Sequence, residues 1–156
     1  MPAGFTIRPM RAEDTQAVYT LHTRAVNEVC AKAYTPQAIK AWNASRTPQG
    51  YLDAEKTGER FLVAVLANEE PIAFIGWKDN EIKGLYVNPD YHGQGIGSAL
   101  VHAAEADAAS MGQTITCLTA TLNAQSFYEK HGFSKLKQDS RIKNGAEIPQ
   151  VHMTRP

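Results

Sequence analysis

A glycine-rich loop between a predicted strand and a predicted helix constrains this chain more than any other segment. The β-forming run Leu85-Tyr86-Val87 leads through a turn into Gln94-Gly95-Ile96-Gly97-Ser98-Ala99, which opens an alanine-rich amphipathic segment. Glycines at 93, 95 and 97 remove the Cβ atoms that would keep a ligand from the backbone, and the first N–H groups of a helix have no partner within it. Because the helix dipole adds partial positive charge there, the loop is predicted to bind a phosphate or pyrophosphate.

The residues around the glycines exclude two common phosphate-binding motifs. A P-loop requires Lys and then Ser or Thr after its last glycine, and this chain has Ser98 and Ala99. A dinucleotide fingerprint requires Gly or Ala where the chain has Ser98 or Leu100, depending on the register. The pattern that does match is Gln/Arg-x-x-Gly-x-Gly/Ala, filled by Gln94, Gly97 and Ala99. This pattern resembles the acetyl-CoA loop of the GNAT N-acetyltransferase superfamily.

A second segment, 123–133, carries the same resemblance. Its sequence Asn-Ala-Gln-Ser-Phe-Tyr-Glu-Lys-His-Gly-Phe looks like the family's other signature, a short helix that ends in Gly-Phe. Asn123 is a good N-cap, Gly132 stands where a helix end favours a left-handed residue, and Phe133 suits the accompanying hydrophobic contact. The resemblance follows the order of elements over the whole chain and is specific from about Glu81 to Phe133.

Length, charge and residue spacing indicate how many domains, which partners and which location to expect. The 156 residues suffice for one core, so we expect a single domain over 5–156. Sixteen basic and sixteen acidic residues cancel, which predicts no global field for nucleic acid or an anionic membrane. No signal peptide and no membrane-spanning apolar run is visible, so we expect a cytoplasmic protein. The two cysteines and five histidines lack metal-ligand spacing, so no metal is expected.

Hydrophobic periodicity and turn residues predict the remaining elements. Strands are expected at 5–8, 61–67, 71–78, 81–87, 114–121, 133–137 and 148–153, and helices at 12–31, 36–45 and 97–111, with a break at 47–50. The nearly continuous apolar run 114–121 indicates a strand buried on both faces and parallel to the one before the long helix. The predicted fold class is therefore α/β, a GNAT-like, largely antiparallel sheet with a central parallel βαβ crossover and flanking helices.

The resemblance implies how acetyl-CoA is held as cosubstrate. The backbone of Leu85, Tyr86 and Val87 is expected to pair with the pantetheine arm. The pyrophosphate is expected on the backbone N–H groups of Gln94, Gly95, Ile96, Gly97 and Ser98. Asn123 has two interpretations of equal weight, a helix cap or a contact with pantetheine.

Acetyl transfer to an amine needs a group that takes a proton from the amine and a group that protonates the departing thiolate. Tyr128 matches the tyrosine that lies near the CoA sulfur in many relatives, which makes it the predicted proton donor, with an amphipathic core residue as the alternative. Glu81 stands four residues before Leu85, the register of a catalytic glutamate in histone-acetylating members. The alternatives for Glu81 are a solvated residue at the strand start and a water chain as the base.

The acceptor pocket is expected in the segment without a family signature. Tyr34 and Trp42 are the predicted substrate-binding residues, with Tyr51 nearby, because aromatic walls suit a small organic or cationic amine. Ordinary core packing is the alternative, and His22 is interpreted as a satisfied helix histidine within reach of the cleft. The predicted function is transfer of an acetyl group from acetyl-CoA to a primary amine of a small molecule. The alternatives are a protein or peptide acceptor and a non-catalytic acyl-CoA-binding module, and a homodimer stays open.

Overall fold

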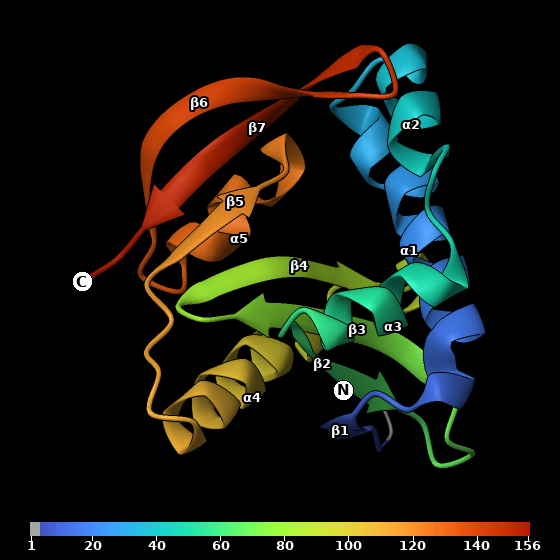
Figure 1. Ribbon diagram of the computed structural model, residues 1–156, viewed down its shortest axis with the longest axis vertical. Coiled ribbons are helices and arrows are strands. Elements are labelled where there is room, and N and C mark those ends of the chain that lie inside the picture. Colours follow the sequence, from blue (N-terminus) through green and yellow to red (C-terminus); the bar gives the residue numbers. More distant parts are fainter. Residues whose placement is uncertain (1–3) are drawn as a thin grey trace.

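One seven-stranded sheet organises the protein, whose computed structural model describes residues 4–156. The spatial order is β1-β2-β3-β4-β5-β7-β6, and every neighbouring pair is antiparallel except β4 and β5 (Figure 1). The strands are β1 (Thr6–Pro9), β2 (Arg60–Val65), β3 (Pro71–Lys78), β4 (Glu81–Val87), β5 (Cys117–Ala120), β6 (Ser134–Lys143) and β7 (Ala146–Thr154). The predicted fold class, a mixed and largely antiparallel sheet with one parallel crossover, is confirmed.

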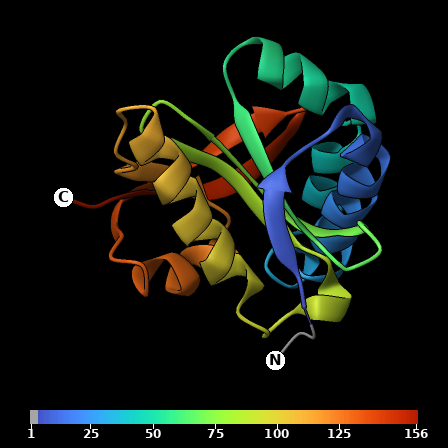
Figure 2. The ribbon, with the colours of Figure 1, turned by 90° about the horizontal axis from the view of Figure 1, so that it is seen from below.

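Helices cover both faces of this sheet. They are α1 (Thr15–Glu28), α2 (Pro36–Asn43), α3 (Pro48–Lys56), α4 (Ile96–Ser110) and α5 (Gln125–Glu129). Figure 2 shows α4 on one face and α1 on the other. Leu100 and Val101 of α4 are fully buried in one core with Ile82, whereas Val18 of α1 is buried in a second core with Phe74. Each face therefore has its own apolar layer, as expected for a sheet buried on both sides.

Helix α3 replaces the break that the sequence predicted at 47–50. Thr47 caps it, because the threonine hydroxyl accepts a hydrogen bond from Gly50 N at 3.2 Å, and Pro48 occupies the first helical position. The helix before this segment does end ahead of Thr47, as predicted, but both residues favour a helix start and the prediction missed α3. The helix buries Tyr51 against the sheet.

Three further boundaries differ from the predictions. The expected helix 12–31 divides into α1 and two 3-10 turns, Ala12–Asp14 and Cys30–Lys32. Strand β5 is shorter than predicted and alternates in burial. The hairpin of β6 and β7 is longer than predicted, because Asn144 (φ 50°) and Gly145 (φ 82°) form a two-residue turn. Asn-Gly is a strong hairpin signal that the sequence interpretation did not use.

Divergence of β4 from β5 positions the site. The two strands pair only through Glu81 with Cys117 and Ile82 with Leu118. On its other edge, β4 stays paired with β3 as far as Val87, and an irregularity leaves Lys83 without a register partner in β3. Such a bulge bends a strand. The edge of β4 that faces β5 is therefore unpaired beyond Ile82, and Figure 1 shows the two strands separating.

Candidate active site

A cleft of about 310 Å³ opens where β4 and β5 diverge. Its walls combine the end of β4, the first turn of α4, the segment after β5, and residues of α1. Leu85, Tyr86, Val87, Gly97, Asn123 and Tyr128 are among the lining residues. The structure thus brings together residues from both sequence motifs, which lie more than twenty-five positions apart in the chain.

The glycine loop brings the start of α4 to this cleft. Gly95 is the residue that precedes the helix and has a left-handed backbone, φ 79° and ψ 6°. A Cβ at this position would meet no atom within 4 Å, so the space beside the backbone is open. Gly97 plays a different part, since a Cβ there would lie 3.2 Å from Phe127 Cζ. Its missing side chain lets α4 and α5 approach closely.

The other residues predicted to hold pyrophosphate differ in where their side chains lie. Gln94 stands in the loop before Gly95, and the Ile96 side chain is buried in the core under α4. The Ser98 hydroxyl is 3.0 Å from His131 Nε2. Their backbone N–H groups belong to the loop and to the first turn of α4, where helix geometry supplies no acceptor.

Tyr128 lies in the wall of the cleft, between two aromatic neighbours. Its ring meets those of Phe127 and Phe133 edge-on, and 5% of the residue is exposed. Burial raises the pKa of the Tyr128 hydroxyl above its usual value, so the phenol is protonated at neutral pH. The predicted Gly-Phe helix stop is also present, with Gly132 at φ 88° and Phe133 N donating to Tyr128 O. The aromatic neighbours fix the position of the ring, and the role of Tyr128 as proton donor stays a prediction.

Asn123 lines the cleft but does not cap the helix. Thr121 precedes the 3-10 turn Leu122–Ala124, and Ala124 is the N-cap of α5. The capping interpretation of Asn123 was therefore wrong. Its side chain lies beside the Cys30 thiol, whose pKa is raised to about 11 by burial and is lowered in part by Asn123.

Tyr34 and Trp42 lie on a smaller cavity of about 140 Å³, which they share with Tyr86. The Tyr34 hydroxyl donates to Pro149 O at 2.6 Å and accepts from Leu122 N at 2.9 Å, which ties β7 to the segment after β5. Trp42 is 3% exposed and packs edge-on against Tyr34. Contact with substrate stays a prediction for both residues, and Tyr34 clearly has a structural role.

Glu81 lies at the other end of β4, where the strand still pairs with β5. Its carboxylate accepts a hydrogen bond from Lys83 Nζ at 3.1 Å, and its side chain is 31% exposed. It is not among the residues that line the cleft. Its role as the base stays a prediction, and the structure does not bring it together with Tyr128.

The sequence interpretation missed a second cavity, of about 390 Å³, which Tyr86 also lines. Tyr86 lines both this cavity and the cleft. Trp42 and Tyr51 also line it, together with basic side chains from the α2–α3 connection and β6. Those basic residues are Arg46, Arg141 and Lys143, and Arg46 is far from the other two in sequence. The one sequence signal is strand alternation, which places Arg141 and Lys143 on the same face of β6, opposite the exposed Ile142.

His22 faces this second cavity from α1. Its ring stacks on Tyr86 with centroids 4.0 Å apart, and its Nδ1 is 2.8 Å from Tyr51 Oη. Its Nε2 is buried and, within residues 4–156, has no hydrogen-bond partner. Burial and the nearby cations lower the pKa of His22 well below its usual value, so the imidazole is neutral at pH 7. The interpretation of His22 as a satisfied helix histidine was wrong for Nε2.

The family model for the acetyltransferase (GNAT) domain matches residues 30–155. The chain belongs to the GNAT acetyltransferase family. The resemblance carried by the glycine loop and by segment 123–133 is thereby confirmed, and the enzyme class is acetyl-CoA-dependent acetyltransferase. Among the described residues, no group of three or more His, Cys, Asp or Glu side chains is placed to hold a metal ion, and no helix is long and apolar enough to cross a membrane.

Similar proteins agree with this family assignment. The uncharacterized N-acetyltransferase YafP of Escherichia coli is 27% identical over 150 residues, which cover 94% of this chain and 93% of YafP. A GCN5-related N-acetyltransferase from Rhodopseudomonas palustris superposes with a TM-score of 0.86 at 27% identity, over 98% of this chain and 96% of that one. The PaiA N-acetyltransferase of Thermoplasma acidophilum, solved with coenzyme A, superposes with a TM-score of 0.77 at 23% identity, over 99% of this chain and all of that one.

Proposed function

We propose that this GNAT enzyme transfers the acetyl group of acetyl-CoA to the amine of a small-molecule acceptor. The observation that carries the proposal is the pair of spaces that Tyr86 lines, a cleft beside the glycine loop and a separate cavity beside His22. A volume of about 390 Å³ lies within the range of small-molecule sites, roughly 300–1,000 Å³. One space is suited to each substrate, and Tyr86 lines both, so the amine and the thioester would meet beside it.

The cleft fits acetyl-CoA through backbone atoms. The unpaired edge of Leu85–Val87 presents N–H and C=O groups to an extended chain with amide groups, such as pantetheine. The open backbone at Gly95 and the first turn of α4 suit a pyrophosphate. Asn123 and Tyr128 also line the cleft. Acetyl-CoA supplies the activated thioester, and the chain supplies its orientation.

The reaction requires one proton to leave the amine and one to reach the thiolate. The amine nitrogen bonds to the thioester carbonyl carbon, the C–S bond breaks, and the sulfur takes its proton from the Tyr128 hydroxyl. His22 Nε2 has a free lone pair when Nδ1 donates to Tyr51, and we assign it the proton of the amine. Exchange with solvent then restores both side chains.

Tyr128→Phe tests the proposal, because the variant removes the hydroxyl and keeps the ring between Phe127 and Phe133. General acid catalysis contributes about 10²- to 10⁴-fold in rate, so kcat is expected to fall by a factor in this range while the affinity for acetyl-CoA stays the same. Tyr19→Phe is the matched control, since Tyr19 is a partly buried residue of α1 that lines neither the cleft nor the second cavity. Wild-type kcat in Tyr128→Phe, with chemistry rate-limiting, would leave Tyr128 as a packing residue.

The alternative functions give different results in the same assays. A non-catalytic module would bind acetyl-CoA by calorimetry yet release no CoA with any amine. A protein or peptide acceptor would show CoA release with lysine peptides and none with small amines. A homodimer and a cytoplasmic location stay predictions from the sequence.

A further inference from the structure

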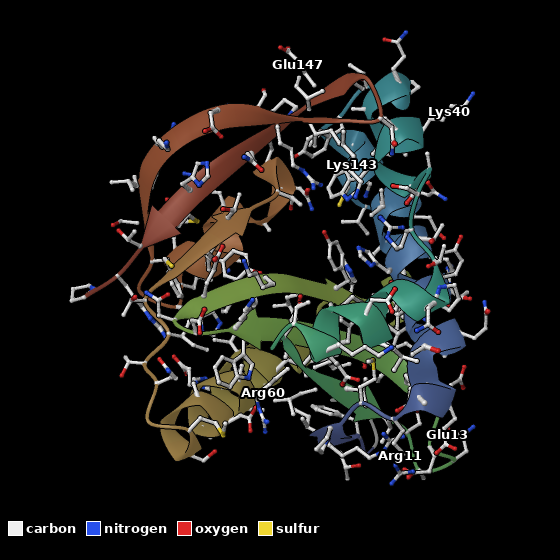
Figure 3. The ribbon with its side chains drawn as sticks, viewed as in Figure 1. Arg11, Glu13, Lys40, Arg60, Lys143 and Glu147 are labelled. Atoms are coloured by element: carbon white, nitrogen blue, oxygen red, sulfur yellow. The ribbon has the colours of Figure 1, made fainter. Side chains whose placement is uncertain are left out.

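Three basic side chains converge on the cavity beside His22. Arg46 reaches it from the connection between α2 and α3, and Arg141 and Lys143 reach it from β6. Arg141 and Lys143 are two positions apart on the strand, so both point to one side, while Ile142 between them is 68% exposed on the other. Figure 3 shows Lys143 beneath the β6–β7 hairpin, near α2.

These three cations have no carboxylate partner among residues 4–156. Arg46 Nη1 donates to Thr23 Oγ1 at 3.2 Å and to Asn43 Oδ1 at 2.5 Å, both neutral. The Arg141 guanidinium lies over the Trp42 ring, 5.6 Å from its centroid. None of the ion pairs in the described chain includes Arg46, Arg141 or Lys143. Their charge is therefore uncompensated within the protein.

Among the described residues, one acidic side chain lies in the cavity wall. Glu59 lines the same cavity, but the charges that act on it are those of Lys83, Lys78 and Glu81. Lys83, a fourth basic residue in the wall, is already paired with Glu81. The cavity thus has a surplus of positive charge at the end formed by α2, α3 and β6.

Holding like charges together at a partly buried site is unfavourable unless an anion joins them. Burial lowers the pKa of Lys143, and Arg141 and Arg46 lower it further. Burial also lowers the pKa of Arg46, and Arg141 adds to the shift. A cluster of cations that no carboxylate among residues 4–156 neutralises points to a ligand of opposite charge.

The phosphates of acetyl-CoA do not account for this cluster. The cavity shares Tyr86 with the cleft, but it includes no residue of the glycine loop at 93–97. A cationic amine, which the aromatic residues alone suggested, would be repelled by Arg46, Arg141 and Lys143. The remaining candidate is the acceptor itself.

We propose that the acceptor is an amine that carries an anionic group, a carboxylate or a phosphate, bound by Arg46, Arg141 and Lys143. This inference rests on the proposed function and defines its substrate class. The amine of the same molecule faces Tyr86 and His22, where the buried Nε2 lacks a partner. Guanidinium groups suit this task because they bind carboxylate and phosphate oxygens through two parallel hydrogen bonds.

Matched pairs of amines test the inference. The carboxylate pairs are L-amino acids and their amides, and the phosphate pair is O-phosphoethanolamine and ethanolamine. For each pair, kcat/KM from CoA release and the rise in Tm caused by the amine are measured for the wild type, Arg141→Gln and Lys143→Gln. Lys40→Gln is the control, because Lys40 is an exposed lysine on the outer side of α2 (Figure 3).

The inference is tested by the preference for the anionic member of a pair, that is, its kcat/KM divided by that of the neutral member. Differences in amine basicity within a pair cancel when the wild type is compared with a variant. Each variant is expected to reduce the preference about 10- to 100-fold, the usual effect of losing one hydrogen bond to a charged group. Lys40→Gln is expected to leave it unchanged. The pair that shows the effect identifies the anion as carboxylate or phosphate.

Three other outcomes separate this inference from the proposed function. Equal use of both members, or a preference that survives Arg141→Gln and Lys143→Gln, would overturn the inference and leave acetyl transfer intact. A third result is that anionic amines raise the Tm of the wild type but not of the variants, and no CoA is released. This result would support the anion site and refute acetyl transfer to these amines. Lys143→Gln is also expected to raise the Tm of the free protein by about 1–3 °C, because it relieves repulsion among the cations.

Discussion

Replacing Gly95 by alanine is expected to weaken acetyl-CoA binding beyond what its effect on the fold explains. The backbone at Gly95 has φ 79°, which an L-residue adopts at a cost of about 1–2 kcal/mol. No atom lies within 4 Å of the added Cβ, so no clash adds to this strain. The methyl group therefore enters open space beside the start of α4, where we propose that the pyrophosphate binds. We expect the affinity for acetyl-CoA to fall at least about tenfold, the effect of about 1.4 kcal/mol.

The chain offers a matched control at the other end of the same helix. Gly112 follows α4, has φ 73°, and also has no atom within 4 Å of an added Cβ. Gly112→Ala therefore introduces the same strain without touching the glycine loop. Both variants are expected to lower Tm by about 2–8 °C, since 1 kcal/mol corresponds to about 2–4 °C in a chain of this size.

Calorimetric titration with acetyl-CoA, at a temperature where both variants are folded, measures the difference. Only Gly95→Ala is expected to bind more weakly than the wild type. Unchanged affinity in Gly95→Ala would remove the loop from the binding site. An equal loss in Gly112→Ala would attribute the effect to strain in α4 and refute the reasoning.

Two further predictions concern carboxylates near β4. Glu81→Gln is expected to change kcat/KM by less than about threefold and to leave its pH profile unchanged. The reason is that Glu81 pairs with Lys83 outside the cleft, and an exposed ion pair contributes little to stability. A shifted acidic limb of the pH profile would instead establish Glu81 as the base. Burial raises the pKa of Glu59 from 4.5 to about 6, so the folded state binds this proton more tightly than the unfolded chain and loses stability as pH rises through that window. Glu59→Gln is expected to remove this loss, so thermal unfolding should show a gain in stability of about 1 kcal/mol at pH 7 and none at pH 4. The gain stays below the full linkage value because the side chain is only half-buried. Equal Tm differences between variant and wild type at both pH values would contradict this prediction.

Local signals were enough to predict most of the fold. Strands β3 and β4 have the predicted bounds, and α4 differs by one residue at each end, because alternation, turn residues and Gly112 act over short stretches. The missed elements also had local signals, namely Thr47-Pro48 before α3 and Asn144-Gly145 between β6 and β7. Those errors came from interpreting Pro and Gly as breaks in general and not as specific caps and turns.

The cleft could be predicted in part, and the acceptor cavity could not. Leu85, Gly97 and Tyr128 lie in motifs whose roles depend on backbone geometry close in sequence, and the structure brings them to one cleft. The register of Glu81 with Leu85 carried no information about the bulge at Lys83 or about the pairing that continues to Cys117. Arg46 and Lys143 come from segments almost a hundred positions apart, and only the tertiary fold places them at one cavity.

Under the proposed function, cosubstrate and acceptor are recognised by different kinds of atoms, because β4 and β5 diverge. The cleft is lined by the end of β4 and by Gly97 in the first turn of α4, whose backbone groups depend little on side-chain identity. The second cavity is closed by side chains from α1, the α2–α3 connection and β6, so its charge follows from the residues at those positions. Tyr86 lines both the cleft and the second cavity. Substitution at Arg46, Arg141 or Lys143 can therefore change the acceptor without disturbing the acetyl-CoA cleft, which is the separation that the matched amine pairs measure.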